Sequence, residues 1–325
     1  MVEEPRKRSG CVKLGCFGCA GAVVLGLVLL GSIVGTGLLM GRPERRPEHS
    51  QVEQDVPTLP VAPLSSTDVG DKAFPQAEFL PTIDEPGRVV LDLREGEFEI
   101  VAGDAPGPIR VEGSYDTAVY ELVTEFERYG ETGWVYHIRF ERKIGWFRML
   151  FNLEDDDNRV RIVLPRDVPM TLEGQVGMGQ FEFDLGGLWL QEIDLSTRMG
   201  EFVLDFDEPL LAPMKRFRLV SGMGDARVDG LGHASPEHVY ASQKMGSLQL
   251  DLRGDWARDA TVQGHVGMGD LTVRLPQGVN VELDDVDQVL GSTELGGHLR
   301  EEHDENAPTL SLRLSQKLGS IQLSR

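Results

Sequence analysis

The sequence predicts an all-β domain built as a β-solenoid of stacked repeats, preceded by one N-terminal transmembrane helix. Three observations support this prediction. Residues Leu14 to Met40 carry no charge. From Arg88 onward, apolar residues alternate with other residues, which is the period of a β-strand. Pairs of Met-Gly or Leu-Gly recur at spacings of 21 to 27 residues, which is typical of a stacked repeat array.

A basic N-terminus, residues 1–13, and a membrane anchor, residues 14–41, come first. The 28 charge-free residues 14–41 exceed the roughly 20 residues needed to cross a bilayer. They are also too many for the apolar region of a cleaved signal peptide, which spans about 7–15 residues. Four Lys/Arg before the segment and three after it favour a cytoplasmic N-terminus. We therefore expect a single-pass protein of the bacterial inner membrane, with its C-terminal domain outside the cytoplasm.

Small residues in and beside the anchor give weaker signals. Gly31 and Gly35 have a spacing that lets two helices approach closely, although glycines are also simply common in transmembrane helices. No apolar stretch precedes Cys16, so we expect no lipid attachment. The residues after the anchor contain no cysteine, which excludes disulfides, a thiolate nucleophile and a cysteine metal site there. The chain has three cysteines: Cys11, Cys16 and Cys19.

A proline-rich linker, residues 42–87, follows the anchor. Eight prolines fall between Pro43 and Gly87, and no periodic apolar pattern survives among them. Proline removes a backbone donor, so we expect neither helix nor sheet in this segment. Its predicted role is to hold the following domain away from the membrane.

Charge is distributed unevenly along the chain. The formal net charge is −21, but residues 1–49 carry seven Lys/Arg and four Asp/Glu, and the remaining 276 residues carry a net charge of −24. A domain this acidic repels phosphate backbones, so we expect no nucleic-acid binding. The acidic surface either keeps the domain soluble or attracts a cationic partner, and the first interpretation is the simpler one.

An N-terminal β region with a hairpin insertion is predicted over residues 88–175. Residues 119–128 and 134–141 have the pattern of a hairpin around Gly130 to Gly133. The acidic run 154–158 indicates a solvated turn, with a calcium site as the alternative. Residues 144–151 pack large apolar residues without alternation, so they are either a strand buried on both faces or an interaction patch. The patch residues are Trp146, Phe147, Met149 and Phe151.

Regular solenoid repeats are predicted over residues 176–325, as one domain with 88–175. Each repeat reads as a strand, a corner at the Met-Gly or Leu-Gly pair, a second strand and a turn. We expect each glycine to adopt a positive φ or to lie close to the neighbouring coil. The predicted corners are Met178 and Gly179, Met199 and Gly200, Met223 and Gly224, Met245 and Gly246, Met268 and Gly269, Leu295 and Gly296, and Leu318 and Gly319.

The methionine column is predicted to be an interior ladder of the core. Methionine fills irregular core gaps, and the neighbouring strands supply alternating Leu, Phe and Val. The alternatives are a soft-metal site and a partner surface. The last strand ends two residues before Arg325 with no capping helix, so we also expect an unpaired terminal coil.

The run Gly267 to Pro276 resembles the signature of bacterial toast-rack and LiaF-like envelope domains, a group that includes adhesin-like proteins. Residues 96–101 and 109–113 resemble the first coils of the same group, and the resemblance covers about residues 88–325. It implies a right-handed, membrane-tethered β-solenoid without catalytic residues, and LiaF-like proteins take part in sensing envelope stress. The chain differs from those proteins in having a single predicted membrane segment.

No catalytic, cofactor or metal site is predicted. None of the common nucleophile, zinc, phosphate-loop or dinucleotide motifs occurs. His233, Ser235 and His238 share a loop without an oriented third group, and the cluster around His298 and His303 reads as a solvated loop. The predicted function is a non-enzymatic envelope interaction, adhesin-like or stress-sensing module, with an envelope protein or a glycan as partner. The alternatives are a self-assembling scaffold and a polysaccharide-acting enzyme. The enzyme would need a column of like outward residues, which the strands lack at Glu182, Glu201, Arg227, Gln249, Thr272 and Gln322.

Overall fold

A computed structural model of the chain describes residues 76–79, 87–129, 133–143, 158–296 and 303–325. The chain divides into two units, residues 1–60 and 61–325, and all described residues belong to the second. They form thirteen strands and one short 3-10 helix, Leu231–His233. The predicted anchor, residues 14–41, lies outside the described residues. Within the described part of the chain, no helix is long and apolar enough to span a membrane.

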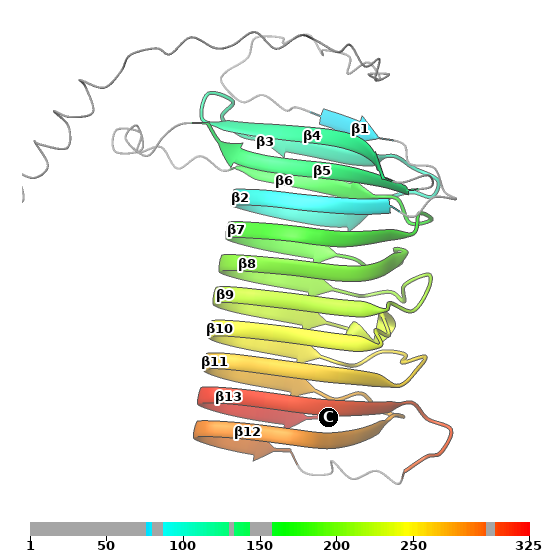
Figure 1. Cartoon of the computed structure of the whole chain (residues 1–325), viewed down its shortest axis with the longest axis vertical. Coiled ribbons are helices and arrows are strands. Elements are labelled where there is room, and N and C mark those ends of the chain that lie inside the picture. Colours follow the sequence, from blue (N-terminus) through cyan, green and yellow to red (C-terminus); the bar gives the residue numbers. More distant parts are fainter. Residues whose placement is uncertain (1–75, 80–86, 130–132, 144–157, 297–302) are drawn as a thin grey trace, which may run out of the picture. The chain divides into compact units, whose positions relative to one another are not determined.

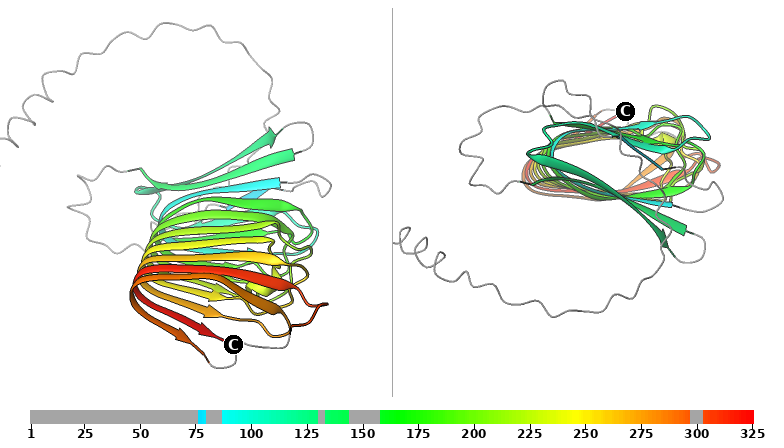
Figure 2. Two further views of the ribbon diagram at one scale, coloured as in Figure 1. Left: turned by 60° about the horizontal axis from the view of Figure 1, so that its bottom comes forward. Right: turned by 90° about the horizontal axis from the view of Figure 1, so that it is seen from above.

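Eight long strands form a stack of parallel coils (Figure 1). Each coil is a single strand that bends near its middle, so its two halves lie in two facing sheets (Figure 2, right). Loops close each coil on the edge opposite the bend. The expected all-β stack of coils is therefore confirmed. In chain order these strands are β2 (Gly87–Ala102), β7 (Met170–Asp184), β8 (Leu190–Asp205), β9 (Arg216–Asp229), β10 (His238–Asp251), β11 (Ala260–Arg274), β12 (Asn280–Leu295) and β13 (Thr309–Ser324).

The core lies between the two sheets and consists of like residues stacked coil upon coil. In the coils β2, β7–β11 and β13, alternate residues of each strand half point inward and are buried. Phe98 stacks on Phe181 with 5.2 Å between ring centroids, and Phe181 packs on Phe202 at 5.9 Å. Because these coils repeat the same inward positions, the parallel register extends apolar columns through the stack from β2 to β13.

The bend of every coil falls on a glycine with a positive φ, as the sequence predicted. These glycines are aligned in register through all eight coils, with φ between +116° and +146°. A Cβ built on Gly224 would lie 2.0 Å from the carbonyl oxygen of Gly200 in the coil before it. Both the backbone angle and the close approach between coils therefore require glycine here.

Glutamines satisfy backbone carbonyls inside the bends, and Gln243 and Gln316 among them are buried. The Nε2 of Gln243 donates to the Gly224 carbonyl at 2.9 Å and to the Met245 carbonyl at 2.8 Å. Gln288 donates to the Gly319 carbonyl at 3.1 Å, and Gln316 donates to the Gly269 carbonyl. Each glutamine thus links its own coil to a neighbour at the corner, where a bent strand leaves backbone acceptors without strand partners.

Two hairpin-like arrangements cover the N-terminal end of the stack. In one sheet β5 (Gly133–Arg142) lies parallel to the first half of β2, and β4 (Tyr120–Tyr129) pairs antiparallel with β5, which confirms the predicted hairpin. In the other sheet, β6 (Arg159–Leu164) pairs with the second half of β2 and β3 (Ile109–Ser114) pairs with β6. The predicted linker is not free of structure, because β1 (Gln76–Phe79) pairs with β3 as an edge strand. Four residues between Pro75 and Pro81 suffice for an edge, where missing donors are tolerated.

The last two coils lie in reverse order, which the sequence did not predict. β13 inserts between β11 and β12, so β12 is the terminal coil (Figure 1). The predicted corner at Leu295 and Gly296 is wrong, because Leu290 and Gly291 are the residues in register with Leu318 and Gly319. The inward residues of β13 are buried and, apart from Gln316, apolar, whereas β12 carries five acidic residues and is largely exposed. The more apolar strand therefore takes the place that is covered on both sides.

Candidate functional site

An exposed column of methionines and leucines runs along the bent edge of the stack, and we call it the methionine ridge. Its members are in register from coil to coil and are 42–62% exposed. They account for seven of the twelve exposed large apolar side chains among the described residues. The prediction of an interior methionine ladder is therefore wrong. In spatial order the methionine ridge consists of Met178, Met199, Met223, Met245, Met268, Leu318 and Leu290.

The bend explains why these side chains point outward. In β7, the buried residues before the corner include Leu172 and Val176, and continuing their alternation would place Met178 inside. After the corner the buried residues are Phe181 and Phe183, an odd number of positions from Met178. The positive φ of Gly179 switches the phase of the strand, so the methionine follows the second half and faces solvent.

The methionine ridge is flanked by charged residues on both sides. The residue before each ridge residue alternates between a cation and a glycine from β7 to β13, and the cations form a cationic row of Arg198, Lys244 and Lys317. The residue two positions after each ridge residue is often acidic, and these residues form an acidic row of Glu201, Asp225 and Asp270. All six side chains are exposed. The apolar edge is therefore bordered by opposite charges.

Neither row finds an ion-pair partner among the described residues, although cations elsewhere on the same strands do. Arg216 pairs with Glu192 and Arg218 with Asp194, both at 2.7 Å. The ion pairs of the described residues include no member of the cationic or acidic row. Asp225 instead accepts a hydrogen bond from the Ser247 hydroxyl at 2.6 Å. The charges beside the methionine ridge are therefore available to a partner.

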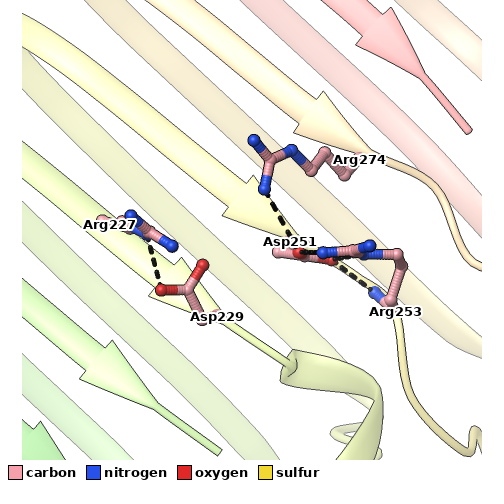
Figure 3. A network of polar contacts seen from close by, with 5 residues as sticks. All are labelled: Arg227, Asp229, Asp251, Arg253 and Arg274. Atoms are coloured by element: carbon pink, nitrogen blue, oxygen red, sulfur yellow. Dashed lines mark hydrogen bonds and ion pairs between the residues drawn. The ribbon is translucent and has the colours of Figure 1, made fainter.

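A second column, of aspartates, lies at the end of the second strand half, near the loops. Asp184, Asp205 and Asp229 are in register, and Asp251 ends the next coil. Figure 3 shows that two of the four are engaged by arginines: Arg227 Nε lies 2.6 Å from Asp229, and Arg253 holds Asp251. The sequence did not lead us to predict this aspartate column, and the outward positions Glu182, Arg227 and Gln249 share no residue type.

Burial raises the pKa of Asp184 and Asp205 above the ordinary value. The charge of Asp207 raises the pKa of Asp184 further, and the charge of Asp229 does the same for Asp205. At Asp251 burial alone would raise the pKa, but the hydrogen bonds from Arg253 and the charge of Arg274 outweigh it and lower the pKa. Two aspartates of the column thus have raised pKa values, and the other two form ion pairs with arginines. No group of three or more His, Cys, Asp or Glu within the described residues is arranged to hold a metal ion.

A polar hollow of about 680 Å³ lies at the N-terminal end of the stack, lined by residues from β2, β3 and β6. Three arginines contribute to it, Arg110, Arg161 and Arg166. Arg166 pairs with Glu208 at 2.8 Å and Arg161 lies 3.7 Å from Glu99. Because two of the three positive charges are already paired, the hollow is a weak candidate for binding an anion.

The remaining sequence-predicted residues come together in no catalytic arrangement among the described residues. The His233 ring contacts the Phe206 carbonyl at 2.7 Å, and the Ser235 hydroxyl accepts from the Ala257 amide at 2.8 Å. His238 lies 3.7 Å from Glu237 and is exposed. Asn158, the last residue of the acidic run, is buried. The other predicted residues lie outside the described residues: Trp146, Phe147, Met149, Phe151, residues 154–157 and His298.

Comparisons with known proteins agree with this architecture. Residues 82–229 match the family model described as the N-terminal domain of toast_rack. No curated protein matches the chain.

Solved structures from three bacteria are similar to the chain. One is a candidate cell adhesion protein from Clostridium sporogenes ATCC 15579, with 15% identity over 78% of this chain and 99% of that one, at a TM-score of 0.45. A candidate adhesin from Bacteroides fragilis NCTC 9343 has 8% identity over 76% and 97%, at 0.30. Another, from Parabacteroides distasonis ATCC 8503, has 11% identity over 78% and 98%, at 0.23.

Proposed function

We propose that the chain is a non-enzymatic interaction module of the bacterial envelope, and the match of residues 82–229 to the model of the toast_rack N-terminal domain supports this proposal. In this proposal the stack of coils displays the methionine ridge to a protein partner. Catalysis has no part in it.

The observation that carries this proposal is the alignment of seven exposed apolar side chains in one column. At about 4.8 Å per coil the methionine ridge is about 29 Å long. Contiguous exposed apolar surface on a soluble domain usually marks a binding site. Methionine side chains are flexible and polarizable, so they adapt to a partner surface. The glycines beneath them fix the edge, so binding need not order the backbone first.

Attachment to the membrane is part of the proposal. Residues 14–41 are charge-free and long enough to span a bilayer, and the proline-rich residues 42–87 would extend from it. The preference of basic residues for the cytoplasmic side places the stack outside the cytoplasm. In a role as a sensor of envelope stress, the chain would receive the signal through a partner bound at the methionine ridge.

End-to-end assembly into a scaffold is less well supported than side-on binding. The outer edge belongs to β12, which carries Glu282, Asp284, Asp285, Asp287 and Glu294 and no basic residue. Acidic side chains on an edge strand repel a second copy of the same edge.

Site-specific photocrosslinking in intact cells tests the proposal. A photoreactive phenylalanine analogue replaces Met223 in the full chain, and the control carries it at Asp255, which is exposed in the loop between β10 and β11 on the opposite edge. We expect a discrete protein adduct at position 223, absent at position 255. Equal labelling at both positions, or no adduct at 223, would refute the proposed function.

A further inference from the structure

We propose that the partner of the methionine ridge is a second copy of this chain, bound side by side with the two stacks running in the same direction. This inference rests on the proposed function and names its partner. It begins from the two charged rows that flank the methionine ridge.

The two rows are complementary to each other. The cationic row lies on one side of the methionine ridge and the acidic row on the other, because they precede and follow the corner of each coil. Both rows lack ion-pair partners among the described residues, whereas Arg216 and Arg218 on β9 are paired. Exposed charges of opposite sign on either side of an apolar edge are what a self-complementary interface requires.

Symmetry decides how two ridges can meet. With a two-fold axis along the stack, the cationic row of one copy faces the acidic row of the other. With the axis across the stack, each row faces its own counterpart, so cations meet cations and carboxylates meet carboxylates. Like charges in juxtaposition disfavour the second arrangement. The charges therefore select parallel stacks.

The heights of the charges also fit the parallel arrangement. Arg198 and Glu201 belong to the same coil, β8, so they lie level across the interface. Lys244 of β10 lies one coil from Asp225 and one coil from Asp270, and Lys317 of β13 lies one coil from Asp270. Each cation is thus within about 4.8 Å along the stack of a carboxylate on the other copy. Every ridge residue meets its own counterpart at the centre.

The interface is narrow, so the dimer is weak in dilute solution. A ridge about 29 Å long and a few residues wide falls below the roughly 800 Å² per partner of a standard interface. Parallel stacks place both N-terminal sides at the same end, which agrees with the proposed anchor in one membrane. Tethering raises the effective concentration of the second copy and compensates for the small contact area.

Chemical crosslinking of the full chain in membranes tests this arrangement. In a background with Cys11, Cys16 and Cys19 replaced by serine, Met223→Cys is treated with a short bis-maleimide. A maleimide bridge is chosen because a disulfide demands closely placed Cα atoms. We expect a covalent dimer for Met223→Cys and little for Asp255→Cys, which controls for collisions between tethered chains.

Two further measurements distinguish the orientation and the charges. Mixed chains carrying Met178→Cys and Leu290→Cys report antiparallel stacks, since these positions lie at opposite ends of the methionine ridge. We expect Met178 to link to Met178 and not to Leu290. Lys244→Glu with Lys317→Glu should reduce the Met223→Cys dimer about tenfold, and adding Asp225→Lys with Asp270→Lys should restore it.

The proposal is overturned by links between Met178 and Leu290, by a dimer indifferent to charge reversal, or by no crosslink above the Asp255 control. An adduct of the photoreactive residue at position 223 with a different protein would also overturn it, while leaving the proposed function intact. Binding of the methionine ridge to lipid vesicles without dimers would overturn both.

Discussion

Replacing Gly224 with alanine tests whether the glycine column holds the coils together. The residue has a φ of +116°, which costs an alanine about 1–2 kcal/mol. In addition, the new Cβ would lie 2.0 Å from the Gly200 carbonyl oxygen, and that oxygen belongs to backbone that cannot rotate away. Relieving the contact requires the two coils to separate locally. We expect a total loss of about 3–5 kcal/mol of unfolding free energy, the range of disruptive core changes.

Gly278 provides the matched control. It also has a positive φ, +72°, but a Cβ there meets nothing within 4 Å. Gly278→Ala should therefore cost only the backbone strain, about 1 kcal/mol. The difference between the two variants isolates the approach between neighbouring coils.

Thermal and urea unfolding of the full chain, followed by circular dichroism, measure the two variants. Since each kcal/mol shifts the Tm of a domain of this size by about 2–4 °C, Gly224→Ala should lower the Tm by about 6–20 °C. The slope of the urea transition shows whether the coils still unfold together. If Gly224→Ala is no more destabilising than Gly278→Ala, the contact between the corners does not limit the fold and our account of the bend is wrong.

Four further predictions concern the corner and the aspartate column. Met223→Ser should change the free energy of unfolding by less than about 0.5 kcal/mol, whereas Leu219→Ala should lower it by about 2–5 kcal/mol, because only the leucine is buried. A large loss of stability for Met223→Ser in the same melts would contradict the outward position of the methionine ridge. Gln243→Ala should cost about 1–3 kcal/mol by leaving buried carbonyls without a donor, and an unchanged urea midpoint would show that water replaces the amide. Asp205→Asn should raise the Tm at pH 7, because the raised pKa makes the ionised form unfavourable in the fold, and the gain should vanish below about pH 4. Asp251→Asn should lower the Tm at pH 7, because a carboxyl whose pKa is lowered in the fold stabilises the protein above about pH 4, and this stability is lost as the pH falls through the pKa of the folded state. If Asp205→Asn and Asp251→Asn change the Tm in the same way with pH, the opposite pKa shifts of the two aspartates are refuted.

The repeat and its glycines were predictable because they are dictated by backbone geometry. Only glycine fits a corner that combines a positive φ with a close approach to the neighbouring coil. Gly179, Gly200 and Gly224 can therefore be recognised as corners from the sequence. The hairpin at residues 120–142 was also predictable, since its alternation and turn are local.

The position of the methionines was not predicted, although the signal was present. Met178 is out of phase with Phe181 and Phe183, and it would have been placed outward had the second strand half set the alternation. The error came from assuming that a large apolar residue beside a core strand is itself in the core. The aspartate column was equally visible, because Asp184, Asp205 and Asp229 each follow their corner glycine by five residues.

The order of the last two coils could not be read from the repeat. Gly291 and Gly296 are both plausible corners, and the choice depends on pairing with β13 rather than on local pattern. Which coil lies outermost is decided by a comparison between whole strands, the apolar β13 and the acidic β12. A repeat count treats the two as equivalent.

The insertion of β13 makes the completion of the stack depend on residues that are synthesised after β12. The ribosome produces β12 before β13, yet the only described neighbour of β12 is β13, whose sixteen residues end at Ser324. Until β13 has been synthesised, the outer edge of β11 has no strand to pair with. A nonsense mutation near residue 300 would therefore remove two coils at once, because β12 would lose the strand that joins it to the stack.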